Sequence, residues 1–539
     1  MSALTNELLQ TFEEFDMDTS SIKLTAQLNK HGGILVMVAI TIVAIGYWLW
    51  TESPLTAHSD SIIDTESAAQ LLNQVVVENA IPAGADDLER PPGYIDIPGN
   101  SDHFDLLFAD NQSEEEAPFY PSRATTDNKT LILDMFEKAE VCAGCHGTIY
   151  DEWKDSIMAN SWDDPIYRAL LAKASAATDG KVDKLCIGCH TPMGLTTDSV
   201  SARGNDKVHI SGIGCDDCHS ISASTGLGNG SYVLTPKKYG RPLKFGPRKD
   251  ASSPYHDTAY SELHTKSEFC STCHNVTHPF NRMPVERTYD EWRDSPYASA
   301  GIQCQDCHMT PEPGVTKNPG KAAVMGPERE LVYSHRFTGA NMTLHKHFGQ
   351  DEMAERALRL LQSAATIEFL AMPSRFEAGA LATVSVRVRN VGAGHKLPTG
   401  FPEGREVWID FSVKDNSGVE VYRLGAIEDG YTEAGTHSFK ATLGDSDGNA
   451  VEFAVWEADR VLSDTRILPK GYSDAKYEFE IPSSVKGPLT ISAQLNYWGF
   501  PQSTLDKIVG ENKIESQIAE MASISEAIPL APRLSHLAP

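Results

Sequence analysis

The chain has 539 residues, which is enough for two or three domains with a substantial core. Acidic residues outnumber basic ones by 74 to 46, and the formal net charge is -28. A surface this negative repels phosphate backbones, which argues against nucleic acid as a partner and favours a basic protein instead.

An uncharged apolar segment lies near the N-terminus, after an acidic stretch over residues 1–32. Residues 34–50, "ILVMVAITIVAIGYWLW", would span about 26 Å as a helix, close to the hydrocarbon thickness of a bilayer. We therefore predict a single transmembrane helix over 33–50. The alternative, a cleaved signal peptide, is disfavoured by the thirty-odd residues before the segment and by its aromatic end, which resembles a membrane-interface belt.

The charges that flank the apolar segment predict its orientation. Lys23 and Lys30 precede it, whereas the first Lys or Arg after it is Arg90. The positive-inside bias therefore places 1–32 in the cytoplasm and the rest of the chain in the periplasm, so that the protein is held in the inner membrane by one helix.

Composition and hydrophobic period divide the remainder of the chain. Residues 51–130 are rich in Pro, Gly, Asp and Glu and indicate a linker or irregular region. Residues 131–370 carry all ten cysteines, and an amphipathic helix over 349–370 closes this part. From 371 to 500 the period changes to two, which predicts an antiparallel β-sandwich, and a helical tail is expected over 501–539. The predicted class is α+β multidomain, with a mostly helical and loop-rich cysteine region.

All ten cysteines fall in five CxxC pairs, and a histidine follows each pair directly. The members are Cys142, Cys145, His146; Cys186, Cys189, His190; Cys215, Cys218, His219; Cys270, Cys273, His274; and Cys304, Cys307, His308. Because histidine is about one residue in thirty here, five such coincidences by chance have a probability of order one in ten million.

The CxxCH spacing is typical of covalent haem attachment. Two thiols on one helical turn can each add to a vinyl group of haem, and the next residue brings an imidazole to the iron. Zinc ribbons are the alternative, but they do not require histidine after each pair, and five pairs would leave one unmatched. We therefore predict five haem c groups with iron bound by the five motif histidines, and this chemistry requires a compartment outside the cytoplasm.

The five motifs begin 44, 29, 55 and 34 residues apart. About 200 residues would therefore hold five macrocycles, which forces neighbouring haems close together. Such a row can pass single electrons from one iron to the next.

At these motifs the sequence resembles the multihaem cytochromes related to hydroxylamine oxidoreductase and to its tetrahaem electron acceptor. The stretch "VCAGCHGTIYDEWKDSIMANSW" is similar to the family element CxxCHxxIYxxWxxSxHAxxF, and "HTKSEFCSTCHNVTHP", "EWRDSPYASAGIQCQDCHM" and "SHRFTGAN" follow in the family's order. "NVGAGHKLPTG" recurs in members with a C-terminal β-domain. The resemblance implies a periplasmic redox protein with mostly six-coordinate haems.

Side chains outside the motifs are candidates for the second axial ligand. The resemblance implies His264 and His335, and we add one of the "LHKHFG" pair, represented by His345, and His209, which lies shortly before Cys215. His395 is flanked by Gly394 and "KLPTG", and we hypothesise that the β-domain projects it onto a haem; a turn-stabilising role is the alternative.

Met158 is the clearest departure from the family pattern, which has histidine at this position. Methionine as an axial ligand would raise the potential of its haem, whereas the alternative is that Met158 only packs. Tyr297 occupies the matching place in a second such block and is expected to pack.

These features predict a membrane-anchored periplasmic pentahaem cytochrome that relays electrons between a membrane respiratory partner and periplasmic redox proteins. No catalytic residue is assigned. Two alternatives remain: an enzyme that acts on a small nitrogen or sulfur oxyanion such as nitrite, hydroxylamine or tetrathionate, and a cytochrome subunit of a larger respiratory complex. Catalysis would require an open axial position.

Overall fold

The computed structural model describes residues 118–531 except 128, 205, 239 and 402. The predicted N-terminal segment, the anchor over 33–50 and nearly all of the linker over 51–130 lie outside the described residues. Within the part that is described, no helix is both long enough and apolar enough to cross a membrane.

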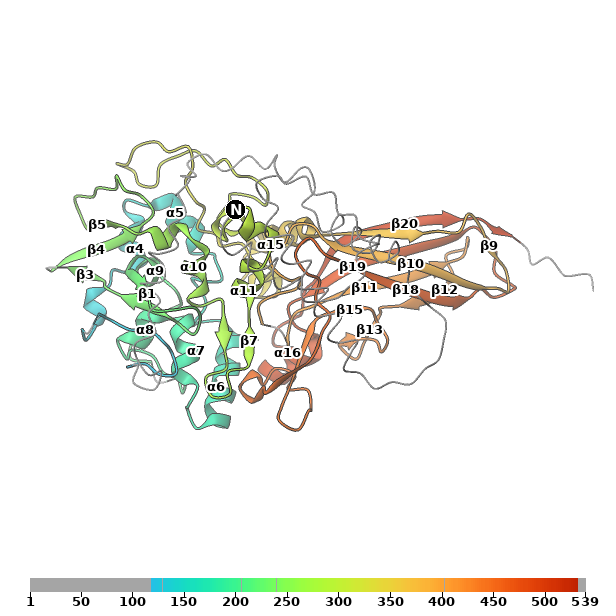
Figure 1. Ribbon diagram of the computed structural model, residues 1–539, viewed down its shortest axis with the longest axis horizontal. Helices are drawn as coiled ribbons and strands as arrows, with labels where there is room; N and C mark the ends of the chain where they lie inside the picture. The colour runs from blue at the N-terminus through green and yellow to red at the C-terminus, as the bar shows by residue number, and fades with distance from the viewer. Residues whose placement is uncertain (1–117, 128, 205, 239, 402, 532–539) are drawn as a thin grey trace, which may run out of the picture. The chain divides into compact units, whose positions relative to one another are not determined.

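The cysteine region consists of short helices joined by loops (Figure 1). Each CxxCH motif lies on or beside one of them, because the motif itself needs only a single helical turn. Their bounds are Ala139–Ala143 (α4), Gly147–Trp153 (α5), Pro165–Thr178 (α6), Asp183–His190 (α7), Pro192–Thr196 (α8), Cys215–His219 (α9), Ser267–Ser271 (α10), Thr288–Arg293 (α11), Pro296–Ser299 (α12), Gln305–His308 (α13) and Met342–His347 (α14), with 3-10 turns at Leu133–Met135 (η4) and Glu262–Thr265 (η5).

The start and end of α6 follow directly from its sequence. The Asp164 carboxylate accepts hydrogen bonds from the backbone N–H groups of Ile166 and Tyr167, and proline occupies the first helical position. Asp179, in the left-handed conformation with φ 52°, ends the helix. Burial raises the pKa of the Asp164 carboxyl to about 6.

Short strands connect the helices of the cysteine region. They pair as β1 with β2, as β3, β4 and β5, and as β6 with β7. Their bounds are Ile221–Ser224 (β1), Tyr232–Leu234 (β2), Lys237–Lys238 (β3), Arg241–Gly246 (β4), Asp257–Tyr260 (β5), Val276–Thr277 (β6) and Pro284–Glu286 (β7).

The helix predicted over 349–370 is confirmed over Asp351–Ala364 (α15), where Met353, Ala357 and Leu361 are buried. Its last predicted turns are wrong, because Ala365–Ala371 form the strand β8. This strand pairs with β10, and the pairing satisfies backbone hydrogen-bonding groups of both segments.

Two sheets form the C-terminal part, and antiparallel pairing runs through both. One has the order β18-β10-β8, and the other has the order β12-β11-β19-β20 with β15 paired to β11 (Figure 1). The remaining strands form small pairs: β13 with β14, β16 with β17, and β21 with β9, the last of these parallel. The bounds are Phe376–Glu377 (β9), Leu381–Asn390 (β10), Glu406–Lys414 (β11), Glu420–Leu424 (β12), Ile427–Glu428 (β13), Tyr431–Thr432 (β14), Ser438–Phe439 (β15), Ala441–Gly444 (β16), Arg460–Asp464 (β17), Tyr472–Glu480 (β18), Leu489–Trp498 (β19), Ile518–Ile528 (β20) and Leu530–Ala531 (β21), with a 3-10 turn at Val455–Glu457 (η6).

The alternation predicted for β10 and β11 is confirmed. Val384, Val386 and Val388 of β10 are fully buried and share one apolar core with Ile409 and Phe411 of β11. Because side chains alternate between the two faces of a strand, these residues point from both sheets into the same core.

The prediction of a helical tail over 501–539 is wrong beyond its first turns. Gln502–Val509 form α16, and Gly510, with φ 99°, follows its end. Ile518–Ile528 then form β20, which pairs with β19 along nearly its whole length. The backbone hydrogen bonds that this segment forms with the open edge of β19 therefore override its helical propensity.

Candidate functional site

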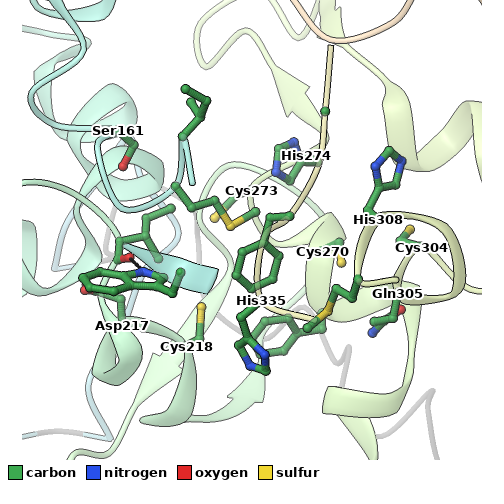
Figure 2. A pocket seen from close by; sticks show the side chains of 18 of the residues that line it. Ser161, Asp217, Cys218, Cys270, Cys273, His274, Cys304, Gln305, His308 and His335 are labelled. Carbon is green, nitrogen blue, oxygen red and sulfur yellow. Dashed lines mark hydrogen bonds between the residues drawn. The ribbon is translucent and has the colours of Figure 1, made fainter. Parts of the chain in front are cut away.

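One cavity of about 1560 Å³ is lined by all ten motif cysteines and all five motif histidines. Ordinary ligand pockets measure about 300–1,000 Å³. Figure 2 shows thiols from three motifs, at Cys218, Cys270 and Cys304, together with the imidazoles of His274 and His308 around this space. The cavity therefore gathers residues that are spread over more than 160 positions of the sequence.

Four of the five motif histidines are held by a hydrogen bond from ring nitrogen Nδ1 to a backbone carbonyl. A carbonyl oxygen only accepts, so Nδ1 donates, and Nε2 is the ring nitrogen left to bind a metal. Such bonds fix the orientation of a metal-binding imidazole and increase its basicity. The bonds are His146 to Ala322 at 2.6 Å, His190 to Ser161 at 3.1 Å, His219 to Phe245 at 2.7 Å and His308 to Thr338 at 2.8 Å.

Two motif histidines face a second histidine across the cavity. The ring centres of His308 and His395 lie 6.3 Å apart, and those of His219 and His335 lie 6.4 Å apart. His264 also lies near His219, at 5.7 Å, but its Nε2 is bonded to the Cys218 carbonyl. Two imidazoles that bind one metal ion through bonds of about 2 Å, with each ring centre about 1 Å behind its nitrogen, lie roughly 6 Å apart. Both separations therefore fit one metal ion between the rings.

The second histidine of each pair also has its Nδ1 occupied. His335 bonds through Nδ1 to the carbonyl of Tyr333 at 3.0 Å, and His395 bonds to its neighbour Lys396 at 2.9 Å. Burial lowers the pKa of His335 to about 4, so its imidazole is neutral at pH 7 and able to bind a metal.

Three further candidate ligands line the cavity: Met158, His256 and His264. His256 bonds through Nδ1 to the Asp257 carbonyl, which leaves Nε2 free. His264 bonds through Nε2 to the Cys218 carbonyl at 3.3 Å, while its buried Nδ1 has no hydrogen-bond partner among the described residues. An unpartnered ring nitrogen in a buried site is consistent with a bound group.

His209 and His345, which the sequence also suggested, are not among the residues that line the cavity. The side chain of His209 is 79% exposed, and its Nε2 lies 3.6 Å from an Asp163 carboxylate oxygen. His345 is buried and bonds through Nδ1 to the Gln350 side chain at 2.8 Å.

His256 lines the cavity although no sequence motif points to it. It stands directly before β5, which pairs with β4, and β4 also carries the Phe245 carbonyl that holds His219. No motif surrounds His256, so the pairing of β4 with β5 is the signal that could have identified it.

Thiols of different motifs interact with one another inside the cavity. A contact with Cys215 lowers the pKa of Cys142, and contacts with Cys189 and Cys270 lower the pKa values of Cys273 and Cys304. The thiols therefore link the first motif to the third, the second to the fourth, and the fourth to the fifth.

A buried ion pair stands beside the contact of the first and third motifs. Lys244 Nζ of β4 lies 2.6 Å from the carboxylate of Asp216, and the two side chains are 13% and 2% exposed. The same carboxylate accepts a hydrogen bond from the Glu137 backbone N–H at 2.7 Å. Asp216 is thus compensated on both oxygens and ties α9 to β4 and to the segment before α4.

The donor set fits covalently attached haem: paired thiols one turn apart, imidazoles whose Nδ1 is hydrogen-bonded and whose Nε2 is left for a metal, and a large cavity with a mainly apolar lining. Together they define a multihaem c-type cytochrome. Residues 141–220 match the family model described as "Cytochrome c554 and c-prime". This part of the chain is a multihaem domain of that family.

A solved structure extends the likeness beyond these residues. The penta-heme cytochrome c552 from Thermochromatium tepidum has a TM-score of 0.52 and 20% sequence identity, and the match covers 73% of this chain and 99% of that one. At this identity the likeness shows the fold alone. The CARDB domain of PF1109 from Pyrococcus furiosus matches 31% of this chain and 86% of its own at 11% identity, but its TM-score of 0.15 supports no argument. No curated protein matches the sequence.

Proposed function

We propose that this protein is a pentahaem electron carrier, held to the inner membrane by residues 33–50, with its haem domain in the periplasm. The observation that carries the proposal is that all ten thiols and all five motif histidines line one cavity. The likeness to a penta-heme cytochrome supports the number five. Haem, when bound, supplies an iron that gains and loses one electron.

The residues of the chain hold and orient this group. Each CxxC pair would attach one haem through two thioethers, and the following imidazole would bind its iron. The carbonyl oxygens that accept from Nδ1 keep the four imidazoles described above in one orientation, so little movement accompanies a change of charge on the iron.

The second axial ligands that we propose are the five candidates on the cavity wall. His335 would share an iron with His219, and His395 would share one with His308, because of the separations of 6.4 and 6.3 Å. Met158, His256 and His264 would serve the remaining irons. A methionine ligand would give one iron a higher potential than the irons with two histidines.

The contacts between thiols support a grouping of the haems. The first motif would neighbour the third, and the fourth would lie between the second and the fifth. Electrons would then pass from haem to haem within each of these two groups.

The partners that we propose are a membrane respiratory protein as donor or acceptor and periplasmic redox proteins on the other side. The net charge of -28 favours a basic docking partner and makes association sensitive to salt. The haem-attachment chemistry of the CxxCH motifs requires a compartment outside the cytoplasm, which supports a periplasmic position for the haem domain.

Intact-mass measurement and spectroscopy of the purified full-length protein test the proposal. We expect a mass increase equal to five haem groups and five low-spin irons that titrate over a range of potentials. A lower haem count would contradict the pentahaem assignment. A high-spin signal that shifts when nitrite or hydroxylamine is added would instead assign catalysis to one haem.

The anchor is tested separately by truncation. A variant that lacks residues 33–50, exported through a cleavable signal sequence, should appear in the soluble periplasmic fraction, whereas the full chain should remain with the membranes. Recovery of the truncated protein with the membranes would contradict the anchoring role of this segment.

A further inference from the structure

The sequence contains two seven-residue blocks that differ at a single position. Residues 150–156 read YDEWKDS and residues 289–295 read YDEWRDS, which we call the first and the second block. A second element is also repeated: "GIGCDDCH" over 212–219 contains the third motif, and "GIQCQDCH" over 301–308 contains the fifth. Each block therefore has a matching motif element further along the chain.

The two blocks adopt the same local structure. The Tyr and Trp rings lie 5.7 Å apart at 45° in the first block and 5.5 Å apart at 40° in the second. Ser156 and Ser295 are both buried, and each accepts a hydrogen bond from the backbone N–H three residues later. The repeat is thus structural and not only a similarity of letters.

The tryptophan of each block is hydrogen-bonded to its matching motif element. Trp153 Nε1 donates to the carbonyl of Ile213, and Trp292 Nε1 donates to the carbonyl of Ile302, both at 2.9 Å. Each isoleucine stands two residues before the first cysteine of its motif.

The backbone completes this contact in the same way in both copies. The N–H of Ile213 donates to the carbonyl of Met158 at 2.9 Å, and the N–H of Ile302 donates to the carbonyl of Tyr297 at 3.0 Å. Each motif element is therefore fixed to its block by two hydrogen bonds on one residue.

The glutamate of each block reaches the loop that carries the opposite histidine. Glu152 accepts from the backbone N–H of His335 at 2.8 Å, and Glu291 accepts from that of Lys396, directly after His395, at 3.2 Å. His335 faces His219 of the third motif, and His395 faces His308 of the fifth. In both copies, one block thus contacts both sides of the same histidine pair.

We infer that each block is a clamp that fixes one iron site from both sides, and that Glu152 and Glu291 are positioning residues for the axial ligands His335 and His395. This inference rests on the proposed ligand pairs. The tryptophan sets the position of the motif, and the glutamate sets the position of the second histidine, so the distance between the two imidazoles is fixed through a single short helix.

The two clamps are not equally strong. Glu291 also accepts from the Thr399 hydroxyl at 2.7 Å and forms an ion pair of 2.8 Å with Arg466, whose side chain is 11% exposed. Glu152 has the single backbone contact to His335 among the hydrogen bonds described here. Removal of Glu152 should therefore loosen its site without affecting the C-terminal sheets.

The test uses the full-length holoprotein and electron paramagnetic resonance, with redox titration as a second readout. His335→Ala and His395→Ala identify the low-spin signal of each site, because each should abolish one. We expect Glu152→Ala to shift or diminish the signal that His335→Ala abolishes, and Glu291→Ala to do the same for the signal of His395→Ala, each without effect on the other. The midpoint potential of the affected iron should shift as well.

Conservative variants keep the test valid if the alanine variants fold poorly. Glu152→Gln and Glu291→Gln retain an acceptor oxygen and should restore the low-spin signals. Trp153→Phe and Trp292→Phe keep an aromatic ring but remove the indole N–H together with the five-membered ring, and each should shift the signal of its own site only. Glu368→Ala is the matched control, since Glu368 bonds to the Arg389 side chain in the C-terminal sheets and should leave all signals unchanged.

The outcomes separate the two proposals. If the histidine variants remove no signal, the proposed ligand pairs are wrong, and the inference of a clamp is refuted as well. If the histidine variants act as expected but the glutamate variants match the wild type, or if either glutamate variant changes both signals equally, the ligand pairs stand and the clamp is refuted.

Discussion

The ion pair between Glu291 and Arg466 joins α11 to the segment after β17, and its removal should cost more than an ordinary surface pair. The two side chains are 5% and 11% exposed and the charged atoms lie 2.8 Å apart. With an effective dielectric of about 20, the attraction at this distance is roughly 6 kcal/mol. Desolvation of both ions opposes most of it, so the net value of the pair is small, but a single remaining charge is expensive.

The two single variants should therefore differ. Arg466→Met leaves the Glu291 carboxylate buried with only the Lys396 N–H and the Thr399 hydroxyl, and should lower the free energy of unfolding by about 3 to 5 kcal/mol. Glu291→Gln keeps these donors, and Arg466 keeps its second partner, Asp464, at 2.8 Å. Its cost should be about 1.5 to 3 kcal/mol, as for one hydrogen bond to a charged group.

Urea unfolding followed by far-ultraviolet circular dichroism measures these differences. The double variant should be more stable than Arg466→Met alone, because a neutral amide at 291 needs no countercharge. Arg423→Met is the control: its pair with Asp410 has side chains 42% and 21% exposed, and its loss should cost at most about 1 kcal/mol. Equal destabilisation by Arg466→Met and Arg423→Met would refute the reasoning.

Three further predictions concern other parts of the molecule. Met158→His should lower the potential of one iron in a redox titration, since imidazole replaces a thioether; unchanged potentials would exclude Met158 as a ligand. Gly212→Ala should cost about 1 to 3 kcal/mol in urea unfolding, because its Cβ would lie 2.5 Å from the Ser161 nitrogen, whereas Gly147→Ala, with open space around it, should be tolerated. Burial raises the pKa of Glu403 from 4.5 to about 7, so its stabilising contribution is complete below pH 4.5 and is lost as the pH rises through 7; Glu403→Gln should flatten this part of the stability profile, and an unaltered profile would contradict the shift.

Local chemistry made part of the site predictable from the sequence. A CxxCH motif needs only one helical turn, so its meaning does not depend on the fold, and all five motifs do line one cavity. The strands β10 and β11 were equally predictable from the sequence, because one buried face of a strand produces apolar residues at every second position.

Contacts between distant segments explain what the sequence did not reveal. Ile518–Ile528 has helical as well as strand character, and only the free edge of β19 decides between them. His209 seemed well placed because it is close to Cys215 in the sequence, yet its side chain is exposed; His256 is further from any motif, yet β5 brings it to the cavity. Sequence distance is a poor guide to ligands that are supplied by tertiary pairing.

The unequal spacing of the two clamps suggests why their relation is hard to see in the sequence. Trp292 is 10 residues from its isoleucine, whereas Trp153 is 60 residues from its own, and the second motif with helices α6, α7 and α8 lies between them. Both hydrogen bonds nevertheless measure 2.9 Å. The contact thus has the same length although the connecting segments differ in length by 50 residues, and the common feature of both copies is a histidine pair with room for one iron.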